Sequence, residues 1–568
     1  MKNAKKGITI TLAAMMLASV AAACSQNTNN GGDKSGNATS VPVATNGSAE
    51  EAETSFWTAP VENDRFTETV KLSALKITPS DVVYANGDSD VDNYYTRWMK
   101  SQFNIEVSYP WTTTQQDTFN SKLSMMLASG EKMPDLVMAK GDIVNDLIDS
   151  GKFMEVGPIF DALASDTWKD AISQAPNAWL PYSRDGKRYG IPILQDAYQS
   201  DSVLWVRQDW LDNVGLSAPT TVEEMEAVLD AFVNKDPDGN GQKDTIGLAI
   251  GIKDGFTSYM SDVNPLFGAN GTMPKQWNKA EDGTLQYGSI QPGARDTLET
   301  LARWFKNGYL PTEAAVYDIN KATESIVQGK AGMIFGAHWL AEWPLGDVVK
   351  NDPNAKFIPI AIPAGADGTK GYKLNPIVNN VMLISKEAEH PDAYFLYTNW
   401  LYERYPTRQE PFNTKDHGIE GDSYFDLHQN KQVAGKSANG DKLSLTTNFV
   451  VIPDLRMKLY ADLLAGKEIT NDFMDQLSIK PEGNKQAAQI LLDSLDYGMP
   501  DMFQGTPTAT MQEMQAFLDK LELETYTKII YGQSPITEFD SFVEKWKSSG
   551  GDKITQEVNE WYKSVGGN

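Results

Sequence analysis

Hydrophobic positions along the first part of the chain follow two alternating periods. Alternation over Val70–Ile77 predicts a strand, and apolar residues at helical spacing predict a helix over Asp92–Phe103. A strand over residues 105–111, a helix over Thr118–Ser129 and a short buried strand over Pro134–Met138 follow in order. This β-α-β-α order predicts an α/β fold with a mainly parallel sheet, in which ligands lie beyond the carboxyl ends of the strands.

A second region of the same kind begins near residue 202. It contains a predicted helix over Thr221–Asn234 and later apolar segments that are typical of strands, at residues 331–336, 357–362 and 379–385. The end of the chain, Thr510–Lys563, is strongly helical, and no internal repeat is present. At roughly 100 to 200 residues per domain, the 568 residues predict two or more lobes.

The N-terminus is typical of a secretory leader. Residues 1–23 contain three lysines, then an apolar stretch that is too short for a membrane span, then Ala21-Ala22-Ala23. Cys24 follows them, and the segment resembles the bacterial lipobox, although Ala21 stands where leucine is usual. We expect Cys24 to be acylated and to hold the protein on the membrane; the alternative is an ordinary signal peptide that leaves a free thiol. Residues 24–64 are then the lipidated N-terminus and a flexible linker rich in Asn, Gly, Ser and Thr.

The composition of the chain disfavours several kinds of partner and of chemistry. The chain carries 50 Lys and Arg against 76 Asp and Glu, a net charge of −26, which disfavours nucleic acid as a partner. An acidic body outside the cytoplasm suggests a neutral or cationic solute. A single cysteine rules out an intramolecular disulfide, and 4 scattered histidines leave zinc or copper without their usual ligands. The function therefore rests on carboxylates, amides and aromatic rings.

One loop, KDPDGNGQKDTIG at residues 235–247, has the spacing of a calcium site. Loop positions 1, 3, 5 and 9 carry oxygen side chains, position 6 is Gly241, and position 7 offers a backbone carbonyl. Position 12 is Gly247 instead of the usual bidentate Glu, so further oxygens must come from elsewhere; the alternative is a polar turn after the helix. The predicted ligands of a structural calcium ion are Asp236, Asp238, Asn240, Gln242, Asp244 and Thr245.

Catalytic motifs are missing from the sequence. It contains no G-x-S-x-G, Walker loop, G-x-G-x-x-G or H-E-x-x-H. Ser73 and Lys76 fit S-x-x-K only formally, because they lie in a predicted strand and face opposite sides. No catalytic residue is therefore assigned, although a pair of carboxylates suited to glycoside hydrolysis stays open among so many acids.

Residues 202–232, SVLWVRQDWLDNVGLSAPTTVEEMEAVLDAF, carry a specific resemblance. They resemble the extracellular solute-binding proteins of carbohydrate ABC importers, in the group that contains maltose-binding and alginate-oligosaccharide-binding proteins. Further similar segments follow the expected order, among them DGKRYGIPI (185–193) and VQGKAGMIFGAHW (327–339). The resemblance spans roughly residues 65–565 and is greatest to the lipoproteins of Gram-positive bacteria; residues 405–490 look like an insertion.

The resemblance implies a type II periplasmic-binding-protein fold, in which two α/β lobes close on a ligand about a hinge. The expected first lobe is residues 65–200 plus 378–500. The expected second lobe is residues 201–377 plus 505–568, and it carries the calcium loop at residues 236–245.

The resemblance also implies a sugar site between the lobes. Sugar rings stack on aromatic planes, and their hydroxyls bond to carboxylates and amides. The family places an aromatic platform just after the strand at 331–336, which here is Trp339, with Trp343 one turn on. The other candidates lie at strand ends or crossings: Trp111, Asp142, Asp196, Tyr198 and Asn379. Trp98, Trp304, Trp546 and Trp561 lie at helical spacings and are expected in the core.

The leading hypothesis is a non-catalytic, monomeric lipoprotein on the outer face of the cell membrane. It captures an oligosaccharide and delivers it to the permease subunits of an ABC transporter. The alternatives are a surface polysaccharide hydrolase or lyase, and a receptor for a peptide or another non-sugar solute. The identity, linkage and length of the sugar do not follow from the sequence.

Overall fold

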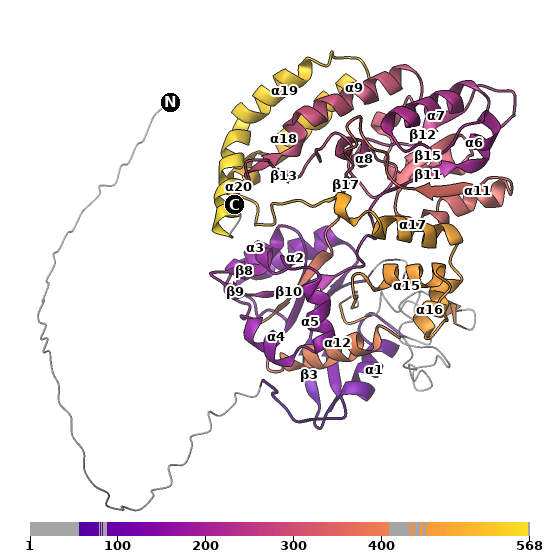
Figure 1. The fold of residues 1–568 in the computed structure, drawn as a ribbon. Coiled ribbons are helices and arrows are strands. Elements are labelled where there is room, and N and C mark those ends of the chain that lie inside the picture. Colours follow the sequence, from indigo (N-terminus) through magenta and orange to yellow (C-terminus); the bar gives the residue numbers. More distant parts are fainter. Residues whose placement is uncertain are drawn as a thin grey trace, which may run out of the picture. The chain divides into compact units, whose positions relative to one another are not determined.

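The computed structural model describes residues 56–565, apart from residues 79, 81, 83–87, 408–431, 434–435, 438–443 and 447–449 (Figure 1). The predicted signal peptide, Cys24 and most of the linker lie outside the described residues. In the described part of the chain, every helix is too short or too polar to cross a membrane.

The first lobe is built from residues on both sides of the second one in sequence. Its core joins apolar residues of β3, α1, α5, α12 and α15, and a smaller cluster lies under α2 and α3. Its helices are α1 (Tyr94–Phe103), α2 (Gln116–Ser129), α3 (Ile143–Asp149), α4 (Gly157–Leu163), α5 (Asp166–Ser173), α12 (Asp392–Arg404), α15 (Leu455–Leu464) and α16 (Asp472–Ser478). Its strands include β3 (Val70–Ser73), β4 (Lys76–Ile77), β5 (Ile105–Ser108), β6 (Thr112–Thr113), β7 (Leu136–Ala139), β10 (Gly190–Leu194) and β18 (Val378–Ile384).

The second lobe surrounds a sheet in the order β12-β15-β11-β16. Its strands β11 and β15 are buried at every position, as expected for a sheet covered on both faces. The strands of this lobe are β11 (Val203–Arg207), β12 (Ile246–Leu248), β13 (Trp277–Lys279), β14 (Leu285–Tyr287), β15 (Ala331–Gly336), β16 (Phe357–Ile360), β17 (Tyr372–Lys373) and β21 (Gly498–Met499). Its helices are α6 (Gln208–Val214), α7 (Val222–Asn234), α8 (Asn264–Gly268), α9 (Pro292–Lys306), α10 (Ile319–Val327), α11 (Leu345–Asn351), α17 (Glu482–Leu492), α18 (Ala509–Ile530), α19 (Glu538–Trp546) and α20 (Asp552–Ser564).

The expected elements form, but the expected strand direction is only partly correct. β3 and β5 pair in parallel, and so do β12 and β15. In contrast, β18 runs antiparallel to β7 and β10, and β11 runs antiparallel to β15 and β16. The prediction of a mainly parallel sheet is wrong for these central strands. Both enter their sheet directly from the other lobe, so no crossover helix sets their direction.

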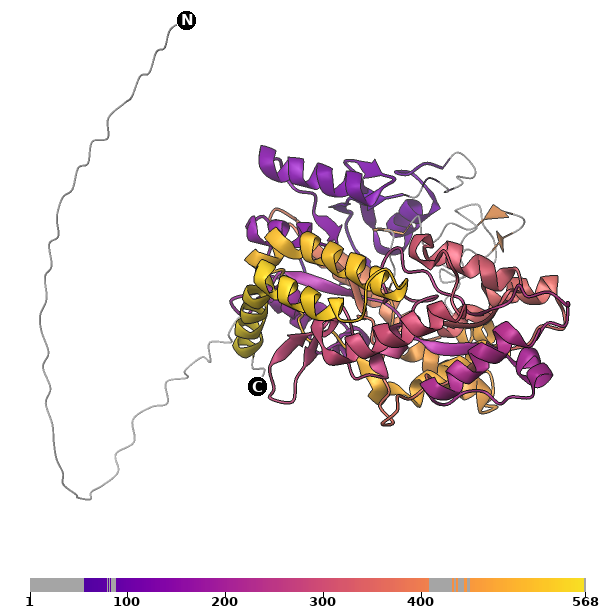
Figure 2. The ribbon, with the colours of Figure 1, turned by 90° about the horizontal axis from the view of Figure 1, so that it is seen from above.

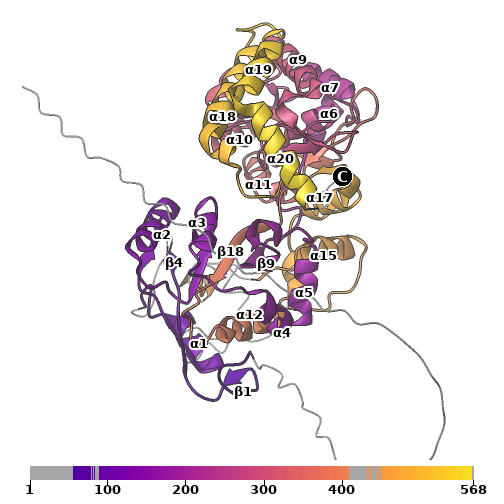
Figure 3. The ribbon, with the colours of Figure 1, turned by 90° about the vertical axis from the view of Figure 1, so that its left-hand side faces the viewer.

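The chain passes between the lobes a third time at a place that the sequence did not indicate. Helix α17 was expected in the first lobe, but Ala487 and Leu491 are buried in a cluster with Trp205 and Leu340 of the second. A Cβ atom at Gly483 would lie 3.1 Å from the Trp205 ring, a tight contact, so the close approach of α17 to β11 favours glycine there. Helix α17 also lies beside α15 of the first lobe (Figure 3).

The predicted linker ends earlier than residue 64. Val61–Glu62 (β1) pairs with Arg65–Phe66 (β2), and Phe56 and Trp57 pack against the first-lobe core. The backbone N–H and hydroxyl of Thr58 both donate to the buried carboxylate of Asp392, at 2.8 and 2.7 Å. These contacts make residues 56–64 part of the lobe.

The predicted helical C-terminus is confirmed as α18, α19 and α20, which are drawn in yellow in Figure 2. Trp304 and Trp546 are fully buried in the second-lobe core, as expected, and Trp98 is buried in the first. Trp561 is only half-buried and packs edge to face on Phe503, with ring centroids 4.8 Å apart.

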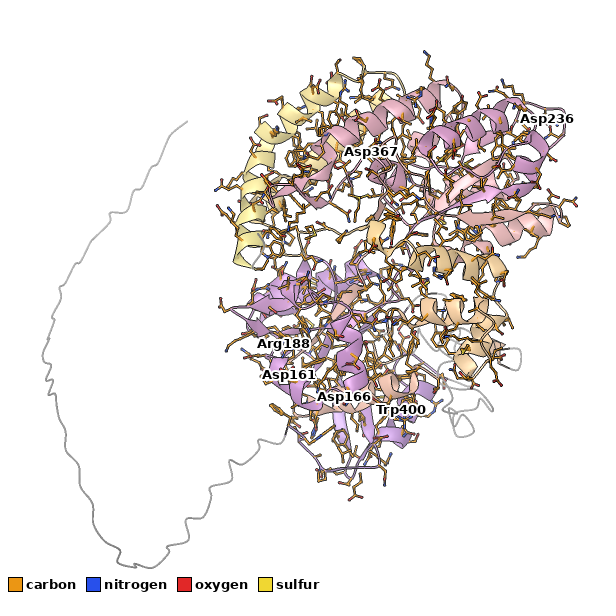
Figure 4. All side chains as sticks on the ribbon, in the orientation of Figure 1. Asp161, Asp166, Arg188, Asp236, Asp367 and Trp400 are labelled. Atoms are coloured by element: carbon orange, nitrogen blue, oxygen red, sulfur yellow. The ribbon has the colours of Figure 1, made fainter. Side chains whose placement is uncertain are left out.

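The first-lobe core depends on interlocked aromatic rings. Trp168 of α5 is 1% exposed and stacks on Tyr402 of α12, with ring centroids 5.5 Å apart. It also meets Phe160 and Phe395 at 5.1 and 5.5 Å. Helix α12, which also carries Trp400, thereby joins α4 and α5 into one layer (Figure 4).

We predict that Trp168→Ala lowers the free energy of unfolding by about 3–5 kcal/mol, because it removes a large buried ring and leaves a cavity. Denaturant midpoints measure the loss. The control is Trp343→Ala, whose side chain is 39% exposed, and it should change stability by less than about 1 kcal/mol. Equal losses in the two variants would contradict this account of the core.

Candidate functional site

A pocket of about 680 Å³ lies where the lobes meet. Its walls come from residues 174–182, 197–198 and 453–454 of the first lobe, and from Gln276 and residues 500–505 of the second. The crossing residues 374–378 complete it. The volume is within the range of roughly 300–1,000 Å³ that small-molecule sites occupy.

Hydrogen bonds between two crossing segments form the base of this pocket. The backbone N–H of Gln195 donates to Ile377 O at 2.9 Å, and its side-chain amide donates to Pro376 O at 2.6 Å. Asn375 donates from its backbone N–H and from Nδ2 to Asp201 Oδ1, both at 3.1 Å, and Nδ2 also donates to Ser200 O. These bonds fix the amide of Asn375 and leave its Oδ1 as an acceptor at the pocket wall.

Two further polar groups at the wall lack complete hydrogen bonding. Gln276 is 5% exposed, and its buried Oε1 has no hydrogen-bond partner in the described part of the chain. Asp501 Oδ1 accepts from the backbone N–H groups of Trp277 and Phe503, both at 3.0 Å. A ligand with hydroxyl groups could donate to these oxygens and remove the cost of leaving them unpaired.

Burial disfavours negative charge around the pocket. Burial raises the pKa of Asp201 to about 6, against hydrogen bonds from Asn375 and the nearby charge of Lys373. Burial likewise raises the pKa of Asp501 to about 6. The pKa of the Tyr198 hydroxyl is raised mainly by burial, and also by Asp201 and Asp454.

Of the predicted ligand-binding residues, the structure places Tyr198 in the pocket wall. Its backbone has a positive φ of 62°, at the point where the chain leaves the first lobe. Asn379 is exposed on β18, next to Val378 of the wall. Asp142 is exposed at the start of α3 and does not line the pocket.

Three other predicted residues are engaged in contacts of their own. Trp339, in the short turn His338–Ala341, donates its indole N–H to Gln199 O at 2.8 Å. Asp196 accepts from Arg456 Nε at 2.9 Å. Trp111 packs on Phe119, and the ammonium group of Lys122 lies 4.9 Å above its ring, which occupies one face of the indole. None of the three lines the pocket.

Sequence reasoning missed Gln276, Asn375 and Asp501. Asn375 lies in LNPIVNN, the crossing segment in which Asn379 is the predicted ligand-binding residue. The sequence therefore indicated the right segment but not this residue. Gln276 and Asp501 lie in irregular segments without a motif. Their place at the pocket depends on how β13 and β21 pack.

The loop after α7 carries most of its predicted ligands at exposed positions, among them Asp236, which is labelled in Figure 4. Asp236 Oδ2 accepts from the N–H of Gly241 at 3.0 Å, which closes the loop. The amide of Asn240 donates to Asp238 and Asp244, at 2.8 and 3.2 Å. The pKa of Asp238 is raised by its partial burial and then by Asp236, with which it shares a hydrogen bond.

This loop fits a hard cation in its donor types, because its predicted ligands are carboxylate, amide and carbonyl oxygens. Thr245 contributes differently from the prediction: its hydroxyl is buried and donates to Phe232 O in α7 at 2.7 Å. Within the described residues, no group of three or more His, Cys, Asp or Glu side chains is already arranged to hold a metal ion.

Comparison with known proteins decides the family. The sequence profile described as bacterial extracellular solute-binding protein matches residues 85–404. The chain belongs to this family. The expected family is therefore confirmed.

Relatives of known sequence cover most of the chain. It is similar to lipoprotein LipO of Bacillus subtilis (strain 168), with 26% identity over 469 residues, which is 81% of this chain and 86% of LipO. It is also similar to the polygalacturonan/rhamnogalacturonan-binding protein YtcQ of the same strain, with 26% identity over 470 residues, 81% of this chain and 86% of YtcQ.

Solved structures show the fold. A solute-binding protein from Bifidobacterium longum infantis, described as HMO-binding and associated with an ABC transporter, has a TM-score of 0.61 at 19% identity and covers 87% of this chain and 98% of its own. The alginate-binding protein AlgQ2, solved without calcium ion, has a TM-score of 0.56 at 16% identity and covers 89% of this chain and 99% of its own. The type II periplasmic-binding-protein fold is confirmed.

We predict that Asp201→Asn reduces the pH dependence of stability. Because the folded pKa of Asp201, about 6, lies above its ordinary value of 3.8, the folded state binds the proton more tightly than the unfolded state. Its contribution to stability is therefore greatest in acid and is lost as the pH rises through 6.

The asparagine keeps the acceptor oxygen for Asn375 but carries no charge. Urea unfolding should show that the variant gains about 1 kcal/mol relative to the wild type between about pH 5 and about pH 7.5. An identical difference between the two proteins at both pH values would show that Asp201 does not titrate in this way.

Proposed function

We propose that this protein is the extracellular substrate-binding lipoprotein of an ABC transporter, and that it captures an oligosaccharide in the pocket between its lobes. The observation that carries the proposal is the set of incompletely bonded oxygens of Gln276, Asn375 and Asp501, contributed to one wall by the second lobe and a crossing segment. Sugar hydroxyls are donors that match such oxygens, and the aromatic residues Tyr182, Tyr198 and Phe503 line the same pocket.

Family membership supports the transport role. YtcQ is described as a polygalacturonan/rhamnogalacturonan-binding protein, and the B. longum infantis protein as HMO-binding and associated with an ABC transporter. Ligand that bridges both lobes favours the closed arrangement, because it binds that arrangement better than the open one. The closed form is then the one that the permease subunits recognise, and the protein performs no chemistry on the sugar.

The N-terminal sequence supports attachment to the membrane. Cys24 after a leader and three alanines is the expected site of acylation, and LipO is a lipoprotein. A long polar segment then separates Cys24 from the anchored Thr58. We expect a monomer held on the outer face of the cell membrane by this tether.

The test of the binding site is Gln276→Ala. If the amide bonds to sugar hydroxyls, its loss should weaken binding of an oligosaccharide ligand at least tenfold, which corresponds to about 1.4 kcal/mol. A glycan library screened by thermal shift supplies the ligand, and isothermal titration calorimetry measures its affinity.

The matched control is Gln286→Ala, which removes the same amide from β14, away from the pocket wall. It should leave the affinity unchanged. Trp339→Ala tests the predicted stacking platform separately. If Gln276→Ala kept its affinity and Trp339→Ala lost binding, the sugar site would lie near Trp339 and not in this pocket.

Calcium is the cofactor that we propose for the loop after α7, with ligands from Asp236, Asp238, Asn240 and Asp244 and from the backbone carbonyl of Gln242. The charge repulsion among its carboxylates supports this assignment, because a cation would relieve it. Bound calcium would connect the end of α7 to β12 and stabilise the second lobe, with no part in ligand binding.

We predict that calcium raises the melting temperature of the protein and that Asp236→Ala removes this response. At a calcium concentration of about 100 times Kd, binding to the folded state alone adds about 2.7 kcal/mol to the free energy of unfolding. Differential scanning calorimetry with calcium and with chelator measures the effect. Asp254→Ala, at an exposed position outside the loop, is the control and should respond like the wild type. Equal melting temperatures of the wild type in calcium and in chelator would leave the loop as a turn.

A further inference from the structure

The charged side chains of the pocket wall are all acidic. Among the described residues that line it, Asp454 and Asp501 are the charged ones, and none is Lys, Arg or His. The polar remainder consists of amides and tyrosines. The wall therefore offers a carboxylated ligand no cation with which to pair.

Further buried carboxyl groups lie around Lys373, the residue before Leu374 of the wall. Lys373 of β17 is the cation whose charge reaches Asp201, Asp262 and Asp501, and it lowers the pKa of each. Burial nevertheless raises all three to about 6, so one lysine does not compensate for three buried carboxyl groups. Asp201 contacts the wall through Asn375, and Asp501 is part of the wall.

Two cations of α15, on the first-lobe side, are already paired. Lys458 forms an ion pair with Asp454, the residue that precedes α15. Arg456 is bonded to Asp196, and both of these side chains are mostly buried. Recruiting either cation to a ligand would leave an acidic partner unpaired at or near the pocket, which is costly.

We propose that the pocket binds a neutral oligosaccharide and excludes uronic-acid oligomers. This inference rests on the proposed function and adds the charge of the ligand to it. The ligand would then differ in kind from those named for YtcQ and for AlgQ2, which are described as binding polygalacturonan or rhamnogalacturonan and alginate. A carboxylate bound about 5 Å from Asp501, in surroundings with an effective dielectric constant near 20, would bind roughly a hundredfold more weakly than a neutral group in its place.

The experiment compares sugars that differ only at C6. The full mature chain is titrated calorimetrically with pairs of equal length and linkage, such as galactotriose and trigalacturonate, and mannotriose and trimannuronate. A wider panel of neutral fructo-, xylo- and gluco-oligosaccharides is titrated at the same concentrations. We expect binding of at least one neutral oligosaccharide, and binding of every uronate at least a hundredfold weaker.

A uronate that binds as tightly as the best neutral sugar overturns this inference and leaves the proposed function intact. No binding by any saccharide overturns the proposed function itself. Asp501→Asn supplies the second measurement, because the asparagine keeps the acceptor for Trp277 and Phe503 but removes the charge.

Relative to the wild type, Asp501→Asn should bind the uronate of a pair about tenfold more tightly. Its affinity for the neutral member of the pair should change less. The control is Asp496→Asn, which removes an exposed charge that does not line the pocket. It should leave the ratio of the two affinities unchanged. An unchanged ratio in Asp501→Asn as well would show that this carboxylate does not select against charge.

Discussion

The arrangement of the pocket depends on a buried carboxylate that joins two crossing segments. Asp201 is fully buried just before β11, and it accepts both hydrogen bonds from Asn375, in the segment that leads into β18. Its other oxygen has no hydrogen-bond partner in the described part of the chain. A buried carboxyl group with one oxygen left unbonded lowers the stability of the fold. The role of Asp201 is therefore better explained by the geometry that it imposes than by a contribution to stability. It sets the position of one crossing relative to the other, and with it the amide of Asn375 at the wall.

The chemistry of the wall suits recognition rather than catalysis. Gln276 keeps a carbonyl oxygen unpaired in a nearly closed environment, and this group gains most from a ligand that donates a hydrogen bond. A molecule of similar shape without such a donor would leave the oxygen unpaired, and sites of this kind discriminate strongly against it.

The local sequence pattern was sufficient to predict the helices and strands but not the residues that line the pocket. Helices α1, α2 and α7 lie where the apolar spacing predicted them, because each buries one face and carries its own boundary signal; Thr221, for example, caps α7 through the N–H of Glu224. The wall, in contrast, is assembled from residues near 176, 276, 375 and 501. Nothing local to Gln276 or Asp501 distinguishes them from surface residues. Trp111 shows the converse: an aromatic residue after a strand has the same pattern whether it stacks on a sugar or, as here, on Phe119 and under Lys122.

Membership of the family determines the fold but not the charge of the ligand. Proteins that share the two-lobed fold present different side chains from the same loops, so the fold alone is compatible with neutral and acidic sugars. A pocket that binds acidic sugars differs from one that binds neutral sugars in whether its wall supplies cations. A uronate loses its hydration when it enters a pocket, and a paired positive charge must replace it. In this chain Arg456 and Lys458 are close to the pocket in sequence and space, yet each is held by an aspartate. The acids at positions 196 and 454 therefore act on specificity indirectly: by pairing with the available cations, they leave the amides and tyrosines to select the sugar.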